Sequence, residues 1–396
     1  MLRLFIENFK AIESLGLDLG RVNLFIGENG CGKSTVLEAL GMAAAAANLS
    51  LTSSALKDRG IRVTDPNWMR SAFREGMRTA LIRLAVQENS AHFFAFLTHD
   101  DTPYGVWQNQ VPSQLGGTLT ISDDKLNEFL SSFSSVSDDA RADFAKAANL
   151  PDFPASVEER ESAKQWVAAA WMRFGAEELH LARFLTYAPR EDVLRDLARD
   201  SDVEPIGIHG EGLFKLLQVL DSEGQLPLVK EQLALLGWFD DLSVASGLNP
   251  SSRALQIRDV FIEGDAPFDQ RSANEGFLFV LLYACLLISK YTPRFFAVDN
   301  VDTALNPKLC ARTVKMFAEL TKTYDRRVLL TAHNPGALDG LDLNDEEQRL
   351  FVVYRNTEGR TRARRILPAD LPAGGEPLRL SEAFLRGYLG ALPTNF

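Results

Sequence analysis

The residues with the clearest chemistry lie in a glycine-rich run at 27–34. This run matches the pattern G-x-x-x-x-G-K-[ST] at every fixed position. Glycines let backbone N–H groups curl around phosphate oxygens, and the start of a helix adds a partial positive charge. Lys33 would then reach the terminal phosphates, and the Ser34 hydroxyl would bind Mg²⁺. The run therefore predicts a loop that binds a nucleoside triphosphate together with magnesium.

The segments around this run fit a phosphate loop. Residues 22–27 are apolar and predict a strand, while residues 33–47 lack proline, are rich in alanine and predict a helix. A thiol at a helix start can be redox-sensitive, but a tolerated small residue is the favoured interpretation of Cys31. The predicted nucleotide contacts in this segment are Asn29, Gly30, Cys31, Gly32, Lys33, Ser34 and Thr35.

A second chemical group follows later in the chain. Residues 294–298 predict a strand that ends at Asp299, which is placed to hold the magnesium through water. Ser34 and Asp299 are therefore the predicted metal residues. Residues 307–323 predict a helix, and residues 327–331 predict a further strand that precedes His333. Alternating strands and helices of this kind predict an α/β fold.

The order of these motifs resembles that of a known ATPase class. Residues 301–306 resemble the D-loop of ABC-type ATPases, residues 272–276 precede a long apolar helix where that class carries its signature motif, and His333 resembles its switch histidine. With residues 6–10 and 23–30, the chain resembles the SMC/RecF/OLD branch, especially compact bacterial AAA family ATPases of anti-phage systems. The resemblance covers about residues 1–45 and 185–340.

The resemblance implies a P-loop NTPase with an ABC-type head, built on a mixed sheet with an antiparallel β subdomain and an inserted helical lobe. ATP and Mg²⁺ would be the cofactors, and two copies would dimerise head to tail around ATP. Lys10 would contact nucleotide near the phosphates. Ser272, Asn274 and Glu275 would face the γ-phosphate of a partner copy, and His333 would sense that phosphate in its own subunit.

The chain also departs from that class at several positions. Asn300 stands where hydrolysing members carry a catalytic Glu, and losing a positioned base typically costs about 10²–10⁴-fold in rate. Hydrolysis is therefore slow, or Asp302 substitutes as the base. The favoured role of Asp302 is capping the helix that starts near Pro307 or shaping the D-loop. Asn274 replaces the usual glycine, which Asn tolerates because it visits positive φ. Arg190 stands where a Q-loop glutamine is expected.

Two functions follow from these motifs. The first is a nucleotide-gated switch or scaffold for a partner effector, plausibly a separate nuclease or toxin in anti-phage defence. The alternative is a RecF-like DNA-repair or DNA-clamp ATPase that grips duplex DNA in the ATP-bound state. Arg360, Arg362 and Arg364 share one face of a predicted strand and could line phosphates, although a solvated sheet face is the commoner meaning of such a run.

The elements that position these residues suggest three segments. Residues 1–124 hold the phosphate loop and an antiparallel subdomain with a hairpin at 78–98. Residues 125–270 form an inserted helical lobe with a return strand near 182–187. Residues 271–396 complete the head with a C-terminal hairpin. Within the insertion, residues 140–148 and 156–174 have helical spacing. Short strands are also predicted at 106–107 and 118–120.

The amino-acid composition limits the classes of protein to which the chain can belong. The chain has 396 residues, of which 46% are hydrophobic and 24% charged, as expected for a globular protein with two or three lobes. Its net charge of −11 means that any anion site must be local. Three cysteines without CxxC spacing argue against a disulfide framework or a zinc site and favour a cytoplasmic location. The apolar run at 276–289 is too short to span a membrane and predicts a buried helix.

Overall fold

The computed structural model divides the chain into two compact units. It describes residues 1–73, 80–102, 105–110, scattered positions between 137 and 154, 159–196, 204–244, 254–263, 267–372 and 378–390. Unit 1 comprises Met1–Asp18, Glu38–Lys57 and Ile61–Ala182, and unit 2 comprises Leu19–Leu37, Asp58–Gly60 and Arg183–Phe396. Helix α1 (Lys33–Ala47) begins in unit 2 and ends in unit 1.

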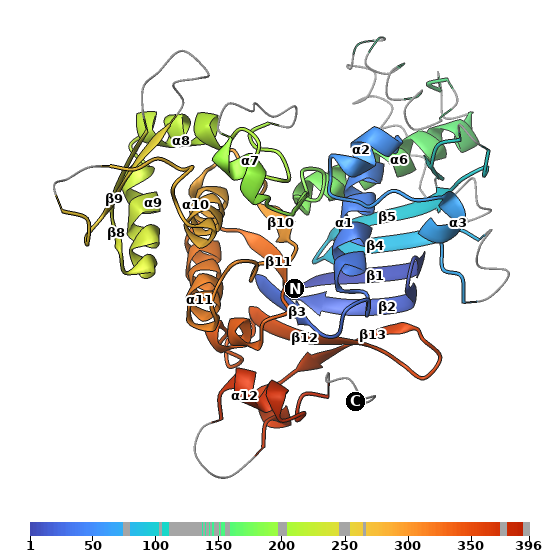
Figure 1. Cartoon of the computed structure of the whole chain (residues 1–396). Coiled ribbons are helices and arrows are strands. Elements are labelled where there is room, and N and C mark those ends of the chain that lie inside the picture. The colour runs from blue at the N-terminus through green and yellow to red at the C-terminus, as the bar shows by residue number, and fades with distance from the viewer. Residues whose placement is uncertain are drawn as a thin grey trace. The chain divides into compact units, whose positions relative to one another are not determined.

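Unit 2 contains a six-stranded mixed sheet in the order β13-β12-β3-β11-β10-β7 (Figure 1). The strands are β3 (Val22–Ile26), β7 (Thr186–Tyr187), β10 (Phe295–Val298), β11 (Arg327–Thr331), β12 (Gln348–Arg355) and β13 (Thr361–Ile366). Neighbours from β12 to β7 run parallel, whereas β13 is antiparallel to β12. Every residue of β3 and β10 is buried, as expected for parallel strands covered on both faces.

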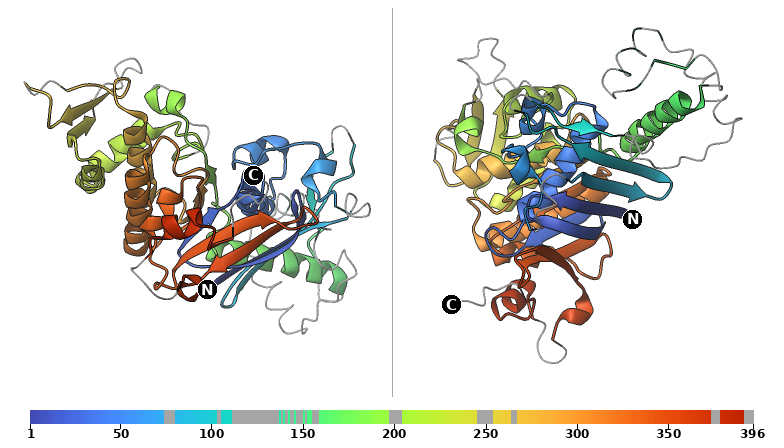
Figure 2. Two further views of the ribbon diagram at one scale, coloured as in Figure 1. Left: turned by 60° about the horizontal axis from the view of Figure 1, so that its bottom comes forward. Right: turned by 90° about the vertical axis from the view of Figure 1, so that its right-hand side faces the viewer.

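Two helices form much of the apolar core of unit 2. Helix α10 (Glu275–Ile288) is buried at every position after its first residue, and it packs against α11 (Pro307–Thr323). Figure 2 shows both helices from two further directions. In the described part of this unit the other helical segments are α7 (Glu191–Arg195), α8 (Leu213–Ser222), α9 (Leu226–Leu233), η3 (Ala234–Leu236), η5 (Pro335–Gly340), η6 (Pro368–Asp370) and α12 (Leu380–Leu385). Strands β8 (Phe239–Val244) and β9 (Leu255–Asp259) form a separate antiparallel pair.

Unit 1 is built on a second, antiparallel sheet in the order β2-β1-β4-β5-β6. Its strands are β1 (Leu2–Phe9), β2 (Ile12–Leu19), β4 (Ile82–Glu88), β5 (Ala91–Thr98) and β6 (Gln108–Asn109). Alternating buried and exposed residues in β4 and β5 give the sheet one core-facing side. Helix α6 (Arg160–Glu178) packs against β5, and α2 (Ser53–Lys57) and α3 (Pro66–Met69) also belong to this unit.

These elements confirm the predicted α/β class, the mixed sheet and the antiparallel hairpin. The bounds of α1, α11 and β11 agree with prediction, whereas β7 is limited to Thr186–Tyr187 and β6 lies at Gln108–Asn109. Strands β2, β8 and β9 and helix α9 were not predicted, because short segments of mixed polarity carry a weak periodic signal. The predicted strand at 118–120 lies outside the described residues, as do most positions of the predicted helix at 140–148.

The boundaries of the two units do not coincide with those of the three predicted segments. The described part of 125–270 does not form one lobe, since α6 belongs to unit 1 and residues from Arg183 onward belong to unit 2. The physical reason is packing: Gly175 of α6 approaches the β5 backbone so closely that an added Cβ would lie 2.1 Å from the carbonyl oxygen of His92. No helix among the described residues is long and apolar enough to cross a bilayer.

Candidate nucleotide-binding site

The site lies in unit 2, where three parallel strands end side by side. Strand β3 leads into the phosphate loop, β10 into Asp299, and β11 into the segment that holds His333. Strand β3 pairs with β11, and β11 pairs with β10, all in parallel. The loops that follow these strands therefore emerge at the same end of the sheet, where the strands have their carboxyl ends. Open parallel sheets bind ligands at this carboxyl edge.

The phosphate loop is held by residues from the distant hairpin β12–β13. The Thr361 hydroxyl donates to the carbonyl of Cys31 at 2.8 Å, and Arg355 Nε donates to the carbonyl of Gly30 at 3.0 Å. Gly32 has φ +110°, and a Cβ at this position would lie 2.6 Å from Thr361 Oγ1. Only glycine fits there, so the loop backbone is preformed and stays open to an incoming phosphate.

Lys33 points back into the loop. Its ammonium donates to the carbonyls of Gly27 at 2.8 Å and Glu28 at 2.9 Å, and the residue is buried. Burial lowers the pKa of Lys33, and the negative charges of Asp299 and Asp302 oppose that shift. A buried cation held by two neutral carbonyls is well suited to exchange them for phosphate oxygens.

Ser34, Asp299 and Thr331 form a cluster of oxygen atoms beside the loop. The Ser34 hydroxyl donates to Asp299 Oδ1 at 3.0 Å, and the Thr331 hydroxyl donates to the same atom at 2.5 Å. Oxygen ligands from hydroxyl and carboxylate groups are those that Mg²⁺ prefers. The two residues predicted to hold magnesium are thus adjacent, and they fit that ion.

Asn300 adopts a left-handed backbone with φ +55°. Its N–H donates to Thr331 Oγ1 at 2.8 Å, which holds the residue in place after Asp299. Asparagine tolerates left-handed φ better than most residues, so the local backbone offers a physical reason for Asn at this position. Its side-chain amide can orient water but cannot accept a proton from it.

The Asp302 carboxylate binds the main chain at His333 and Asn334, which we name the switch segment. Its Oδ2 accepts hydrogen bonds from the N–H groups of His333 at 2.9 Å and Asn334 at 2.5 Å. Among the described residues, its Oδ1 is buried without a hydrogen-bond partner. Helix α11 is capped instead by Asn306, whose side chain accepts from the N–H of Leu309 at 3.0 Å. The prediction that Asp302 caps this helix is therefore wrong, and its carboxylate shapes the loops around it.

The His333 side chain is exposed while its backbone is fixed by Asp302. Partial burial lowers the pKa of His333, and the positive charge of Lys33 adds to this effect, whereas Asp302 and Asp299 oppose it. This shift favours the neutral imidazole. A neutral imidazole can donate one hydrogen bond to an anion through its protonated nitrogen.

The remaining residues of the loop are arranged as a phosphate site requires. Asn29 and Gly30 are exposed at its tip, and Thr35 is buried in the first turn of α1. The first N–H groups of a helix have no intrahelical partner and remain available to an anion. Cys31 is buried, and burial raises the pKa of its thiol, which disfavours a reactive thiolate.

The predicted signature residues surround the start of α10. Asn274 is the N-cap of this helix, and its side chain accepts from the N–H of Phe277 at 2.8 Å. Its φ is −70°, so asparagine suits this position because it caps the helix and not because it tolerates positive φ, contrary to our expectation.

The other predicted signature residues lie beside this cap. Ser272 is exposed. Burial raises the pKa of Glu275, the first residue of α10. A Cβ on Gly276 would lie 3.3 Å from the carbonyl oxygen of Ala304, which places the D-loop against this helix start.

Lys10 lies in unit 1, where its ammonium donates to Glu38 Oε2 at 2.8 Å and to the carbonyl of Arg62 at 2.8 Å. Glu38 is buried and also accepts from Arg62 Nε at 2.7 Å. Burial lowers the pKa of Lys10, and the Glu38 charge opposes this shift. The predicted contact of Lys10 with nucleotide stays a prediction.

The hairpin arginines are engaged within unit 2. Strand β13 begins at Thr361, so Arg360 lies in the turn before it, where it pairs with Glu358 at 3.0 Å. Arg362 Nη1 donates to the carbonyl of Thr361, and Arg364 Nη2 donates to that of Leu389. Arg362 and Arg364 alternate within β13, and Arg360 directly precedes the strand, so the shared face of all three stays a prediction.

Sequence reasoning missed several residues that shape the site. Thr331, Arg355 and Thr361 come from strands far from the motifs they hold, and no local pattern marks them. Arg195 of α7 donates to the carbonyls of Gln270 at 3.0 Å and Arg271 at 2.7 Å, which fixes the segment before the signature. Arg190, found in place of a Q-loop glutamine, pairs with Asp192 at 2.9 Å.

Comparison with known proteins agrees with this geometry. A family model described as "AAA domain, putative AbiEii toxin, Type IV TA system" matches residues 22–339. No curated protein sequence matches the chain.

Among solved structures, an SMC head bound to the C-winged helix domain of ScpA is 12% identical, with a TM-score of 0.50, and the match covers 92% of this chain and 97% of that one. An SMC head with an extended coiled coil from Pyrococcus furiosus, bound to the C-terminal domain of ScpA, is 10% identical, with a TM-score of 0.47 and coverage of 93% and 97%. The SMC head domain of Thermotoga maritima is 13% identical, with a TM-score of 0.44 and coverage of 92% and 98%.

Proposed function

The chain belongs to the AAA-domain family whose model spans residues 22–339. From this premise we propose that it is an ATPase of the SMC-like ABC type and acts as an ATP-gated switch. ATP with Mg²⁺ joins two copies head to tail, and the closed dimer positions a separate effector protein. The observation that carries the proposal is the convergence of Lys33, Ser34, Asp299 and His333 at one edge of the unit 2 sheet.

Each residue has a role that follows from its surroundings. Lys33 exchanges its two carbonyl partners for phosphate oxygens, and Ser34 with Asp299 holds magnesium, which neutralises phosphate charge when bound. The neutral imidazole of His333 donates to the γ-phosphate. Ser272 and Asn274 are exposed at the start of α10, available to a phosphate bound in a second copy.

Slow hydrolysis follows from Asn300. Because this amide cannot take a proton, the ATP-bound dimer is long-lived, as suits a switch more than a motor. The family description, which names a toxin and a Type IV TA system, supports a role beside an effector. One SMC head of similar fold is bound to a domain of ScpA, which is in keeping with a partner protein. The hairpin arginines, paired within unit 2, give no specific support to DNA clamping.

The test is the mass of the protein with ATP and Mg²⁺, measured by light scattering beside direct ATP binding. We expect the wild type to bind ATP and double its mass. Lys33→Ala should lose both properties, whereas Ser272→Arg should keep ATP binding and lose the dimer. A wild-type chain that binds ATP while remaining a monomer would overturn the switch, and one that does not bind ATP would overturn the nucleotide site itself.

A further inference from the structure

Three consecutive apolar residues project from the turn that follows β9. Val260, Phe261 and Ile262 are 53%, 79% and 47% exposed, and we name them the β9 tip. Turns are normally rich in Gly, Pro, Asn, Asp and Ser, because these residues suit turn geometry and solvent. A contiguous exposed patch of large apolar side chains marks an interaction site more often than does a single exposed residue.

Three hydrogen bonds restrain the backbone of the β9 tip. Asp259 Oδ1 accepts from the N–H of Phe261 at 2.8 Å, and its carbonyl accepts from the N–H of Ile262 at 3.2 Å. The N–H of Val260 donates to the carbonyl of Trp238 at 2.9 Å. A preformed tip loses little conformational freedom on binding, which favours its use as an anchor.

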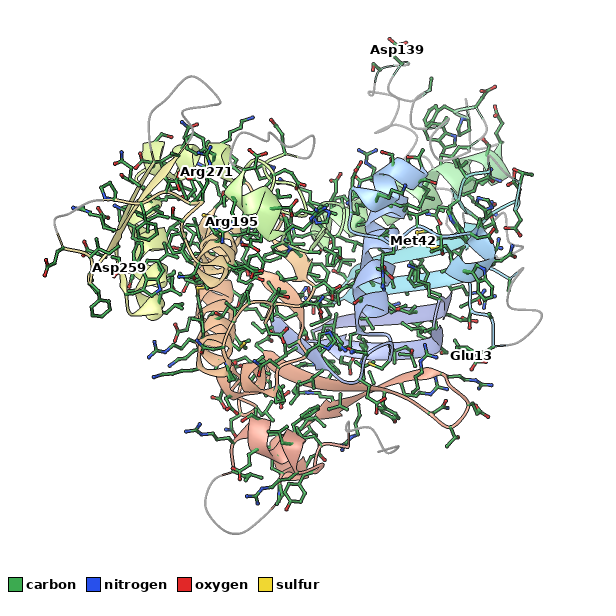
Figure 3. All side chains as sticks on the ribbon, viewed as in Figure 1. Glu13, Met42, Asp139, Arg195, Asp259 and Arg271 are labelled. Carbon is green, nitrogen blue, oxygen red and sulfur yellow. The ribbon has the colours of Figure 1, made fainter. Side chains whose placement is uncertain are left out.

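Acidic residues surround the β9 tip. Asp259, labelled in Figure 3, and Glu263 flank it in sequence, and Asp240 is on the paired strand. Arg258 lies 2.6 Å from Asp241 and 3.9 Å from Asp240, and Lys230 pairs with Asp241 at 2.7 Å. The four carboxylates near the tip therefore outnumber these two cations. The tip is therefore an apolar anchor in a negative environment, and its complement is an apolar pocket with a positive rim.

The chain carries such a pocket elsewhere in unit 2. A groove of about 980 Å³ lies between the start of α11, η5 and α12, and we name it the α12 groove. Pro335, Leu341, Leu380 and Leu385 are among its apolar lining residues, and Leu385 is 63% exposed. The volume is at the upper end of the range for small-ligand pockets, which gives room for a cluster of apolar side chains.

The rim of the α12 groove is positive. Lys308 and Arg379 line it and are both exposed. Asp339 also lines the groove and keeps its negative charge, while its two oxygens accept from the N–H of Ser381 at 2.9 Å and from its hydroxyl at 2.7 Å. Two cations against one anion leave the rim with a net positive charge. The groove therefore matches the β9 tip in polarity and is opposite to it in charge.

We propose that the β9 tip of one copy binds in the α12 groove of a second copy. Strand β9 and helix α12 lie at separate ends of unit 2 in Figures 1 and 2, so the tip does not fill the groove of its own chain. The contact joins two different surfaces and is heterologous, so repetition builds a ring or a filament. It requires no nucleotide, and it is therefore separable from the ATP-dependent dimer proposed above.

Sedimentation velocity without nucleotide, over a range of protein concentrations, tests the proposal. We expect reversible association that Phe261→Asp weakens about tenfold or more, because removing a central aromatic anchor typically has such an effect. The matched control is Phe174→Asp on α6, which changes another largely exposed phenylalanine (69%, against 79% for Phe261) outside both surfaces. Association that is absent in the wild type, or equally reduced by both variants, would overturn the proposal.

Charge reversal and cross-linking identify the partner surface. Lys308→Glu should weaken association, and Glu263→Lys in the same protein should restore it. The natural cysteines Cys31, Cys285 and Cys310 are buried, so Phe261→Cys and Leu385→Cys can be mixed and oxidised. We expect a cross-linked dimer that contains one of each variant. Failure to form it would contradict the tip-to-groove contact, as would flotation with neutral lipid vesicles that Phe261→Asp abolishes.

Discussion

Asp302 holds the backbone of His333: one carboxylate oxygen accepts the N–H groups of His333 and of the next residue, Asn334, at 2.9 Å and 2.5 Å. A residue of the loop that follows the predicted magnesium strand thereby sets the position of the predicted phosphate sensor. Two charge-assisted hydrogen bonds to one oxygen fix a loop more firmly than one bond between neutral groups. We therefore interpret Asp302 as a positioning residue. To act as a base, it would need water at its other carboxylate oxygen, Oδ1, which is buried.

Substitution of Asp302 separates these two roles. Asp302→Asn keeps an acceptor for the two N–H groups, so we expect kcat within about tenfold of wild type, whereas loss of a base would cost about 10²–10⁴-fold. Asp302→Ala leaves both N–H groups without their acceptor and should lower the free energy of unfolding by about 1–3 kcal/mol. Turnover and urea denaturation measure the two effects. A collapse of kcat in a fully stable Asp302→Asn protein would establish the base.

Replacing Asn300 by Glu should raise turnover while lowering stability. A carboxylate at this position can accept a proton from water, which is worth up to about 10²–10⁴-fold in rate. The left-handed φ of +55° costs a residue other than Gly, Asn or Asp about 1–2 kcal/mol. Asn300→Gln is the matched control, since it carries the backbone cost without a base. Equal turnover in both variants would refute the slow-hydrolysis account of Asn300.

Two glycines of the phosphate loop should respond differently to substitution. At Gly32 the φ of +110° and the 2.6 Å approach to Thr361 Oγ1 both oppose a Cβ, so Gly32→Ala should lose about 1–3 kcal/mol of stability and most ATP affinity. Gly30 has φ +74° with open space around it, so Gly30→Asn should be tolerated. Thermal unfolding and ATP titration provide the comparison. Similar losses in both variants would argue against the role of the β12–β13 hairpin in holding the loop.

The pKa of His333 should lie below 6.5 in the nucleotide-free protein, because burial and Lys33 disfavour the imidazolium. As pH falls, this histidine therefore stays neutral longer than a histidine free of these influences. Lys33→Gln removes a positive charge and should raise its pKa, whereas Asp302→Asn removes a negative charge and should lower it. Histidine NMR titration, assigned with His333→Gln, measures both shifts. Shifts of the same sign in the two variants would contradict this electrostatic account.

Much of the nucleotide site was predictable because its motifs are local. The glycine pattern at 27–34, the apolar strand before Asp299 and the alanine-rich helix after Lys33 each depend on neighbours in sequence, and the structure confirms these elements. The partners of the site were not predictable. Thr361 and Arg355 reach the phosphate loop from a hairpin more than three hundred residues away, and only chain folding brings them there.

The sequence alone predicts a phosphate loop in an α/β fold, since the spacing and type of neighbouring residues determine this motif and the elements on either side of it. The mixed sheet was implied by the family resemblance, and the structure confirms it. Tertiary structure alone assigns Asp302 to the switch segment and Asn274 to a helix cap, because both roles depend on which N–H groups lie within hydrogen-bond distance. It also divides the predicted insertion between two units, since side-chain packing across the fold outweighs continuity along the chain.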